Sequence, residues 1–363
     1  MVVGFFCVCL VALAQQGEPL SVLGRHELAC PVCEQVFTTV ACVQSNTRGG
    51  VDRDLFARAL GPQPEFYRIS TCPGCGYSGY GDDFEAGTII PPDVREKVLK
   101  APRLRLPAGF TPQSDPRELD AADRYTLAIT CYRWRGKSDE ALGWLHLRAS
   151  WIAREEGSSL PRDSRLQRVM EYIERWRPTM RAGDNQADIE LRMAARVAEA
   201  ITSGRFNRYQ KPYVELALAL ILRRHGENSQ AQTILDRLAG HEGFAPPVRE
   251  GIERMRDSIV REREHQQEAS ALFERALLAD QVASANRGPA RYLLGELCRR
   301  LGRADEAKRW FDQALAEPSL PADLRGWARE QSRPWESEKT EVRSQKSEVG
   351  RQESAGGRQG RNR

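Results

Sequence analysis

The sequence predicts an α+β protein that is mostly α-helical, in which a small four-cysteine zinc ribbon precedes a tetratricopeptide-like helical solenoid. The ribbon is predicted by two Cys-x-x-Cys motifs in the N-terminal third, Cys30-Pro31-Val32-Cys33 and Cys72-Pro73-Gly74-Cys75. The solenoid is predicted by long amphipathic segments rich in Ala, Leu, Arg and Glu, in which a helical-hairpin pattern recurs with a period of about 34 residues. At 363 residues the chain is long enough for two such domains.

The first predicted segment, residues 1–14, resembles a signal peptide. It carries no charge and ends in Ala12-Leu13-Ala14, which has the small-x-small form of a cleavage site. The stretch is too short to span a bilayer, so we expect no membrane span in the mature chain. It slightly favours export to the periplasm, whereas the missing N-terminal Lys or Arg, and the ease of keeping zinc thiolates reduced, favour the cytoplasm. Residues 15–24 are predicted to be a linker.

Residues 25–90 form the predicted zinc-ribbon-like module. Gly76 can adopt the positive φ that lets backbone N–H groups approach the sulfurs, whereas Glu34 at the matching position costs about 1 kcal/mol of strain. Four thiolates leave zinc no open coordination position, so we predict a structural zinc ion bound by Cys30, Cys33, Cys72 and Cys75. Replacing Cys72 with Ser is expected to unfold the module and leave the helical region folded. Two local disulfides or a redox pair are the alternatives.

The other elements of the module are predicted from local patterns. Alternating apolar residues indicate strands at 36–42 and 66–70, and Asp52–Leu60 has the spacing of a helix. His26 is expected to face solvent, and Cys42 to be a small buried strand residue rather than a fifth ligand. Four acids are interpreted as helix caps and loop anchors, with a second metal or acid–base site as the alternative: Asp52, Asp54, Asp82 and Asp83.

A Pro-rich connector with a short helix is predicted at residues 91–117, followed by tetratricopeptide-like repeats at 118–331. Cys131 and Cys298 lie on first helices of repeats and are predicted to be packing residues. Residues 332–363 have almost no apolar side chains, which predicts a disordered tail. The predicted repeats are residues 122–155, 212–245 and 288–321, with a degenerate copy at 250–283.

Arginines recur where the first helix of a repeat ends before its turn. In tetratricopeptide arrays the first helices line the concave face, so these arginines would form a basic strip for an acidic peptide or a free C-terminus. The simpler alternative is that they complement the helix macrodipole, each worth about 0.3–1 kcal/mol. The residues are Arg133, Arg223, Arg224, Arg299 and Arg300.

Several longer motifs accompany the cysteines. In chain order they are Asp52-Arg53-Asp54-Leu55, Pro64-Glu65-Phe66-Tyr67-Arg68-Ile69, Asp82-Asp83-Phe84, Trp144-Leu145-His146-Leu147-Arg148-Ala149-Ser150-Trp151 and Tyr292-Leu293-Leu294-Gly295-Glu296-Leu297-Cys298-Arg299-Arg300-Leu301-Gly302. With them, residues 27–316 resemble an uncharacterised bacterial family catalogued as domain of unknown function 2225. The resemblance implies a zinc-ribbon-like module joined to tetratricopeptide-like helices, without an established activity. The signal-like N-terminus and Gln63, where Asn is usual, depart from the family pattern.

These observations favour a non-catalytic protein-interaction module. The sequence contains no Gly-x-Ser-x-Gly, phosphate loop or His-Glu-x-x-His motif, so we predict no enzymatic activity. One alternative is a nucleic-acid-associated zinc-ribbon protein. The five arginines and eight acids of residues 25–88 disfavour it, because nucleic-acid binders usually carry a basic face. A thiol redox protein is the other alternative.

Overall fold

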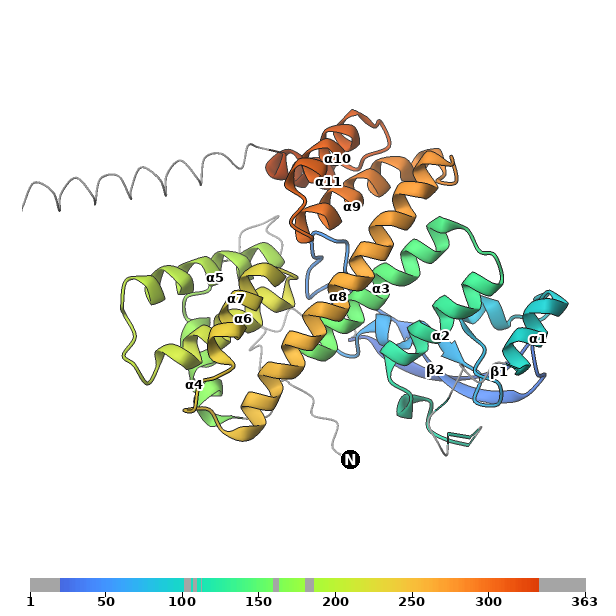
Figure 1. Cartoon of the computed structure of the whole chain (residues 1–363), viewed down its shortest axis with the longest axis horizontal. Coiled ribbons are helices and arrows are strands. Elements are labelled where there is room, and N and C mark those ends of the chain that lie inside the picture. The colour runs from blue at the N-terminus through green and yellow to red at the C-terminus, as the bar shows by residue number, and fades with distance from the viewer. Residues whose placement is uncertain are drawn as a thin grey trace, which may run out of the picture.

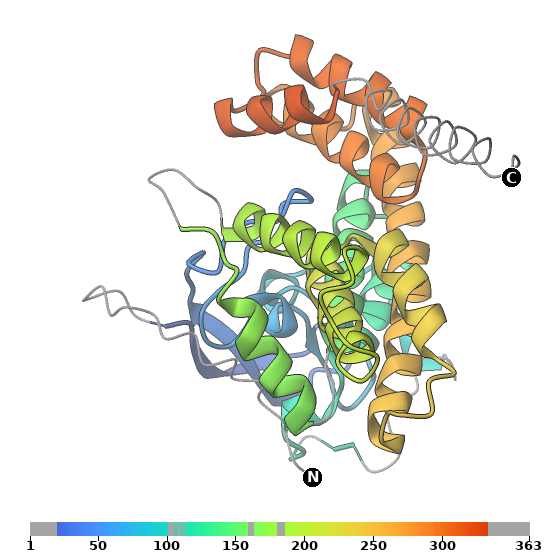
Figure 2. The ribbon, with the colours of Figure 1, turned by 90° about the vertical axis from the view of Figure 1, so that its left-hand side faces the viewer.

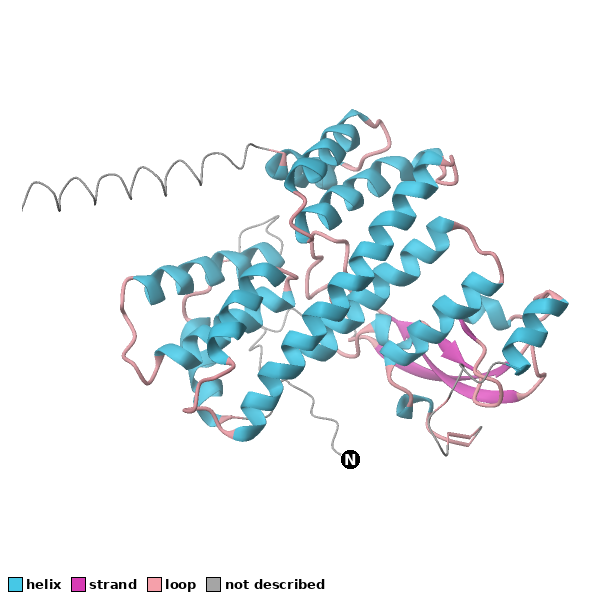
Figure 3. Ribbon diagram, viewed as in Figure 1, coloured by secondary structure: helices cyan, strands magenta, loops and turns pink. Residues whose placement is uncertain are grey.

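The computed structural model describes residues 20–100, 106, 110–111, 113–158, 163–179 and 186–332. The signal-like segment, residues 15–19 of the predicted linker and residues 333–363 of the predicted disordered tail lie outside this part. The fold is mostly helical, with two small sheets gathered on one side (Figure 3). Within the described part, no helix is long and apolar enough to cross a membrane.

Two antiparallel hairpins carry the two cysteine motifs. Strands β1 (Val22–Ala29) and β2 (Val36–Gln44) form the longer one, and β3 (Ser70–Thr71) and β4 (Ser78–Gly79) form the shorter one. Each Cys-x-x-Cys motif is therefore the turn of a hairpin, as expected for a ribbon. The predicted linker extends too far, because residues 22–24 pair with β2.

Two further local predictions are wrong. The strand predicted at 66–70 is reduced to Ser70–Thr71, since Pro64 begins a 3-10 helix that continues to Tyr67. The helix predicted at Asp52–Leu60 is a hairpin-like loop, in which Arg58 N–H donates to Gly50 O and Asp52 N–H donates to Phe56 O, each at 2.9 Å.

The cysteine module shares its core with two helices, α1 (Pro92–Lys100) and α2 (Ala121–Trp134). Val94 and Val98 of α1, with Leu127 and Cys131 of α2, pack in the same buried cluster as the cysteine motifs. The predicted connector thus supplies a helix to the module core. Burial of these apolar side chains stabilises the module and α2 together.

The remaining helices are arranged about a pair of long ones, α3 (Asp139–Gly157) and α8 (Pro246–Leu278) (Figure 1). Four helices share one core with the N-terminal half of α8, and three stand at its other end (Figure 2). The first group is α4 (Ser164–Glu174), α5 (Gln186–Thr202), α6 (Lys211–Arg224) and α7 (Asn228–Leu238); the second is α9 (Arg287–Arg300), α10 (Ala304–Ala316) and α11 (Ala322–Gln331).

Helices α3 and α8 pack closely and antiparallel. Asp139 bonds Arg275 near one end, and Arg154 bonds Glu262 near the other. A Cβ on Gly157 would lie 1.7 Å from Ser258 Oγ, so a side chain there would force the helices apart. Because α8 is one continuous helix of 33 residues, the degenerate hairpin predicted at 250–283 is wrong. Neither glycine nor proline follows Gly251 in this helix to break it.

The other three predicted repeats do form helical hairpins, α2–α3, α6–α7 and α9–α10. The turn after each first helix contains a glycine with positive φ: Gly136 at 62°, Gly226 at 72° and Gly302 at 79°. At each turn the N–H of the following residue reaches the carbonyl five residues earlier, the pattern of a Schellman motif. The hairpins are separated by α4, α5 and the long α8, so their stacking as a tetratricopeptide-like solenoid stays a prediction.

Candidate functional site

The two cysteine turns have the same backbone conformation. Glu34 N–H donates to Cys30 O and Gly76 N–H donates to Cys72 O, both at 2.8 Å. The φ angles are 64° at Glu34 and 76° at Gly76. The predicted positive φ at the residue after each motif is therefore present in both turns. Glu34 adopts it without the freedom of a glycine, which costs about 1 kcal/mol.

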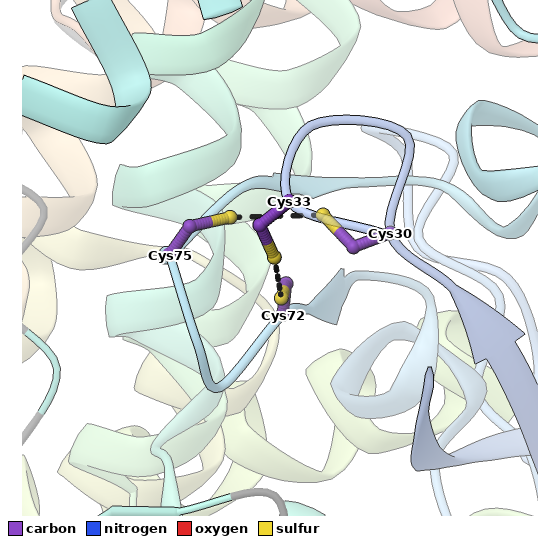
Figure 4. Close-up of side chains that lie close together, drawn as sticks. All are labelled: Cys30, Cys33, Cys72 and Cys75. Carbon is purple, nitrogen blue, oxygen red and sulfur yellow. Dashed lines mark hydrogen bonds between the residues drawn. The ribbon is translucent and has the colours of Figure 1, made fainter. Parts of the chain in front are cut away.

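The four sulfur atoms of these turns lie close together (Figure 4). All lie within 4.8 Å of one another. Two close contacts join different turns, 3.6 Å from Cys30 to Cys75 and 3.5 Å from Cys33 to Cys72. Metal–sulfur bonds of about 2.3 Å in a tetrahedron imply sulfur separations of about 3.8 Å. The cluster therefore fits a bound metal ion.

Hydrogen bonds from neighbouring thiols favour a thiolate at Cys30, although burial opposes it. Cys30 and Cys72 are buried, whereas Cys33 and Cys75 are partly exposed. Hydrogen bonds from Cys72 and Cys75 lower the pKa of Cys30 to about 4. The same contact raises the pKa of Cys75, because its own S–H is the donor to Cys30. Metal ligation requires such thiolates.

A loop between the two cysteine turns reaches away from them into the helical region. This charged loop, residues 48–61, approaches α8 and α9, where it appears as a blue loop (Figure 1). Every second residue from Asp52 to Arg58 is buried, including Asp54 and Phe56. Leu55 adopts φ of 69°, which turns the chain at the tip. The loop thus inserts two carboxylates between helices.

Arg154 of α3 is the centre of a buried charge network. Its side chain is fully buried, donates to Glu262 of α8 at 2.9 Å and to Asp52 at 3.3 Å, and also bonds Asp54. Trp151 Nε1 donates to Asp54 at 3.1 Å. We define the network by its buried members, Asp52, Asp54, Arg58, Arg154, Glu190, Arg223, His225, Glu262, Glu296 and Arg300.

The network lowers the pKa of four of its carboxyl groups, those of Asp52, Glu190, Glu262 and Glu296. Burial alone would raise the pKa of Asp52, but Arg58 and His225 hold it well below its usual value. Burial would likewise raise the pKa of Glu262, but Arg154 and Arg223 lower it to about 2. A buried charge is tolerated only when it is paired and hydrogen-bonded in this way. The loop-anchor interpretation of Asp52 and Asp54 therefore matches their contacts.

These features all lie in the part of the chain that is matched by one family model. The sequence model of a family described as "Uncharacterized protein conserved in bacteria (DUF2225)" matches residues 23–259 and 253–334. The chain belongs to this family. The match spans the four cysteines, the charged loop and helices α1 to α11. Searches among curated proteins and among solved structures gave no match.

The other acids and cysteines singled out in this DUF2225 chain have simpler roles. Asp83 anchors a loop, because it accepts from Tyr80 N–H at 3.0 Å and from Tyr132 OH at 2.5 Å, whereas Asp82 is exposed. His26 is exposed on β1, and Cys42 is only partly buried, with its thiol 2.9 Å from Gln44 O. The buried Cys131 and Cys298 pack in apolar clusters, as predicted.

The five arginines predicted to line a basic groove do not share an exposed strip. Arg223 and Arg300 are buried, and bond Glu262 and Glu296 respectively. Arg299 is partly buried against Glu227 at 2.9 Å. Arg224 is half-exposed and Arg133 is exposed. The predicted groove is therefore wrong for Arg223 and Arg300, because buried carboxylates already occupy their guanidinium groups.

Arg154, Glu262 and His225 were missed by sequence reasoning, although a weak signal was present. Arg154 follows Leu147 and Trp151 at the i+7 and i+3 positions of the buried face of α3. Glu262 occupies the matching place in α8, after Ile259. A charged residue at apolar-face spacing indicates a buried ion pair, but its partner is far away in sequence.

His225 makes the network sensitive to pH. Its Nδ1 and Nε2 lie 2.9 Å from Asp52 and Glu190 carboxylate oxygens. Burial lowers its pKa, but the two carboxylates raise it above the usual 6.5. The stability that the protonated His225 ring contributes is therefore fully present below about pH 6.5, and it is lost as pH rises through the folded-state pKa of His225.

We accordingly expect the free energy of unfolding to fall as pH rises above about 6.5. Urea denaturation at a series of pH values measures it. His225→Gln should flatten this part of the profile, whereas His241→Gln, in the α7–α8 connection, should retain it. A profile in His225→Gln identical to that of the unchanged chain would contradict the charge assignment.

Proposed function

We propose that this protein is a non-catalytic protein-interaction module with one structural zinc ion and a tetratricopeptide-like helical scaffold. The observation that carries the proposal is the meeting of four sulfurs, within 4.8 Å, at the turns of two hairpins. Cys30, Cys33, Cys72 and Cys75 would hold the ion. With four thiolates bound, zinc has no free position for a substrate or water, and its contribution is to folding.

The sulfur arrangement supports a metal site over a thiol redox pair. In a redox Cys-x-x-Cys motif the two sulfurs of one motif exchange a disulfide. Here Cys30 and Cys33 also contact sulfurs of the other turn, at 3.6 Å and 3.5 Å, so that all four thiols form one cluster. Both motifs also pack into the core shared with α2. Such sulfurs favour a closed, structural shell.

The helical region supports the scaffold part of the proposal. Three hairpins present paired helices whose turns have the same Schellman geometry. The α3–α8 pair joins them to the cysteine module through the charge network. A rigid helical frame of this kind suits the display of binding surfaces. The negative net charge of residues 25–88 continues to disfavour a nucleic acid partner.

Metal analysis of purified protein tests the proposal. We expect one zinc ion per chain, measured by inductively coupled plasma mass spectrometry after purification under reducing conditions. Cys72→Ser should lose the ion, and Cys298→Ser, which removes a buried thiol elsewhere, should keep it. Protein without zinc, or a disulfide within either motif found by peptide mapping, would contradict the structural zinc site.

A further inference from the structure

A groove of about 860 Å³ lies where the cysteine module meets the middle of α8. The start of α2 and the end of α3 complete its walls. Its size falls within the range of about 300–1,000 Å³ that is common for ligand pockets. Apolar side chains line part of it, among them Phe66, Tyr67 and the exposed Val260.

Arg124 in this groove is a buried cation without an acidic partner. It is only 6 % exposed, and its Nη1 and Nη2 donate to the carbonyls of Ile69 at 3.3 Å and Phe66 at 2.6 Å. Its Nε, also buried, has no hydrogen-bond partner, and no carboxylate of the described residues lies within 4 Å. The buried Arg154 has three carboxylates instead. An unpaired buried guanidinium is costly, so an anion bound beside Arg124 would stabilise the chain.

Two more arginines from α8 face the same groove. Arg254 and Arg261 are exposed and form no ion pair with any described residue. With Asp257 they occupy one face of α8, at i, i+3 and i+7. Arg117, in contrast, is already bound to Asp115, at 2.5 Å. Arg254 and Arg261 are thus available to a ligand, and Arg124 adds an unpaired positive charge to the wall of the groove.

We propose that this groove binds the carboxylates of an acidic peptide segment, with Arg124, Arg254 and Arg261 as the anion-binding residues. The inference rests on the proposed interaction function and names its partner chemistry. Arginine forks match carboxylates, and Phe66, Tyr67 and Val260 provide contacts for neighbouring apolar side chains. Three acids also line the groove, Asp120, Glu156 and Asp257, so its positive charge is local and suits single carboxylates rather than the continuous charge of a nucleic acid backbone.

Glu156 gives the groove a second, independent property. Burial, and then the negative charges of Asp120 and Asp123 at the start of α2, raise the pKa of Glu156 to about 7. Arg261 of α8 and the N–H of Ala122 act in the opposite direction and lower it. Arg117, Arg124, Arg254 and Asp257 are the other charged groups that line the groove. Above about pH 7 the ionised Glu156 competes with an incoming carboxylate for the arginines. Peptide binding should therefore strengthen as pH falls to about 6.

Fluorescence anisotropy tests the proposal with the full-length, zinc-containing chain. The probe is a fluorescein-labelled octapeptide of alternating glutamate and phenylalanine, and its control has glutamine in place of glutamate. We expect the double variant Arg254→Gln with Arg261→Gln to bind the probe at least about tenfold more weakly. Arg168→Gln with Arg309→Gln, exposed residues of α4 and α10, should bind like the unchanged chain.

Glu156→Gln should bind the probe more tightly at about pH 8 and abolish the difference between about pH 8 and pH 6. The groove proposal is overturned if the Arg254/Arg261 variant binds as tightly as the unchanged chain, or if the glutamine peptide binds equally well. It is also overturned if a single-stranded oligonucleotide binds more tightly than the probe. Zinc content is measured in the same samples, so failure of the groove and failure of the structural zinc site are distinguished.

Discussion

Removing the proposed zinc ion, or replacing Cys72 with Ser, is expected to unfold the cysteine module and to loosen α2 with it. Structural zinc contributes folding free energy on the order of 10 kcal/mol, comparable to the whole stability of a typical domain. Cys72 is fully buried and packs with Tyr77, Phe37 and Leu127. Water therefore cannot replace the interactions that its sulfur makes. This should be the largest effect of any single side-chain change described.

The structure revises the expectation that the helical region survives this change intact. Leu127 and Cys131 of α2 belong to the same core as the cysteines, and the charged loop joins the module to α3, α8 and α9. We expect hydrogen exchange in Cys72→Ser to rise in β1 to β4 and α2 and to remain slow in α6 and α7, whose core is separate.

Thermal unfolding followed by circular dichroism, with exchange mass spectrometry for location, measures the response. Cys298→Ser is the matched control, because it changes a buried cysteine outside the cluster. A Cys72→Ser chain with an unchanged melting temperature and unchanged exchange would contradict a structural role for the site.

The parts of the fold that sequence predicted are those specified by local chemistry. The spacing of Cys30 and Cys33, repeated at Cys72 and Cys75, marks two turns that must meet if they share a metal. Gly136 and the equivalent glycines mark helix ends, since a Schellman turn requires positive φ. The family resemblance was confirmed by the match that covers most of the chain.

The parts that were missed depend on contacts between distant segments. The charged loop alternates between buried and partly buried residues. Three of the buried ones are charged, Asp52, Asp54 and Arg58, so hydropathy does not reveal the alternation. Its spacing therefore resembled a helix. Arg223 looked like a helix-terminal cation because its partner, Glu262, lies 39 residues away. Tertiary pairing overrode the local signal in both cases.

Arg154 is the place where such a tertiary contact can be measured best. Its guanidinium contacts carboxylates from the charged loop and from α8, and it is fully buried. Arg154→Met preserves much of the side-chain volume but leaves Asp54 and Glu262 without their principal cation. Breaking a buried pair from one side typically costs about 3–5 kcal/mol, so we expect that loss in the free energy of unfolding.

Urea denaturation of Arg154→Met and of Lys308→Met compares the loss of a buried cation with the loss of an exposed one. Lys308 pairs with Asp312 at 2.8 Å on the exposed face of α10, where removal should cost less than about 1 kcal/mol. The gap between Arg154→Met and the unchanged chain should narrow as pH falls toward 4. Carboxylates that have lost Arg154 can then take up protons, whereas Glu262 with a pKa of about 2 stays ionised in the unchanged chain. A cost as small as that of Lys308→Met, at every pH, would show that the network does not hold the charged loop in place.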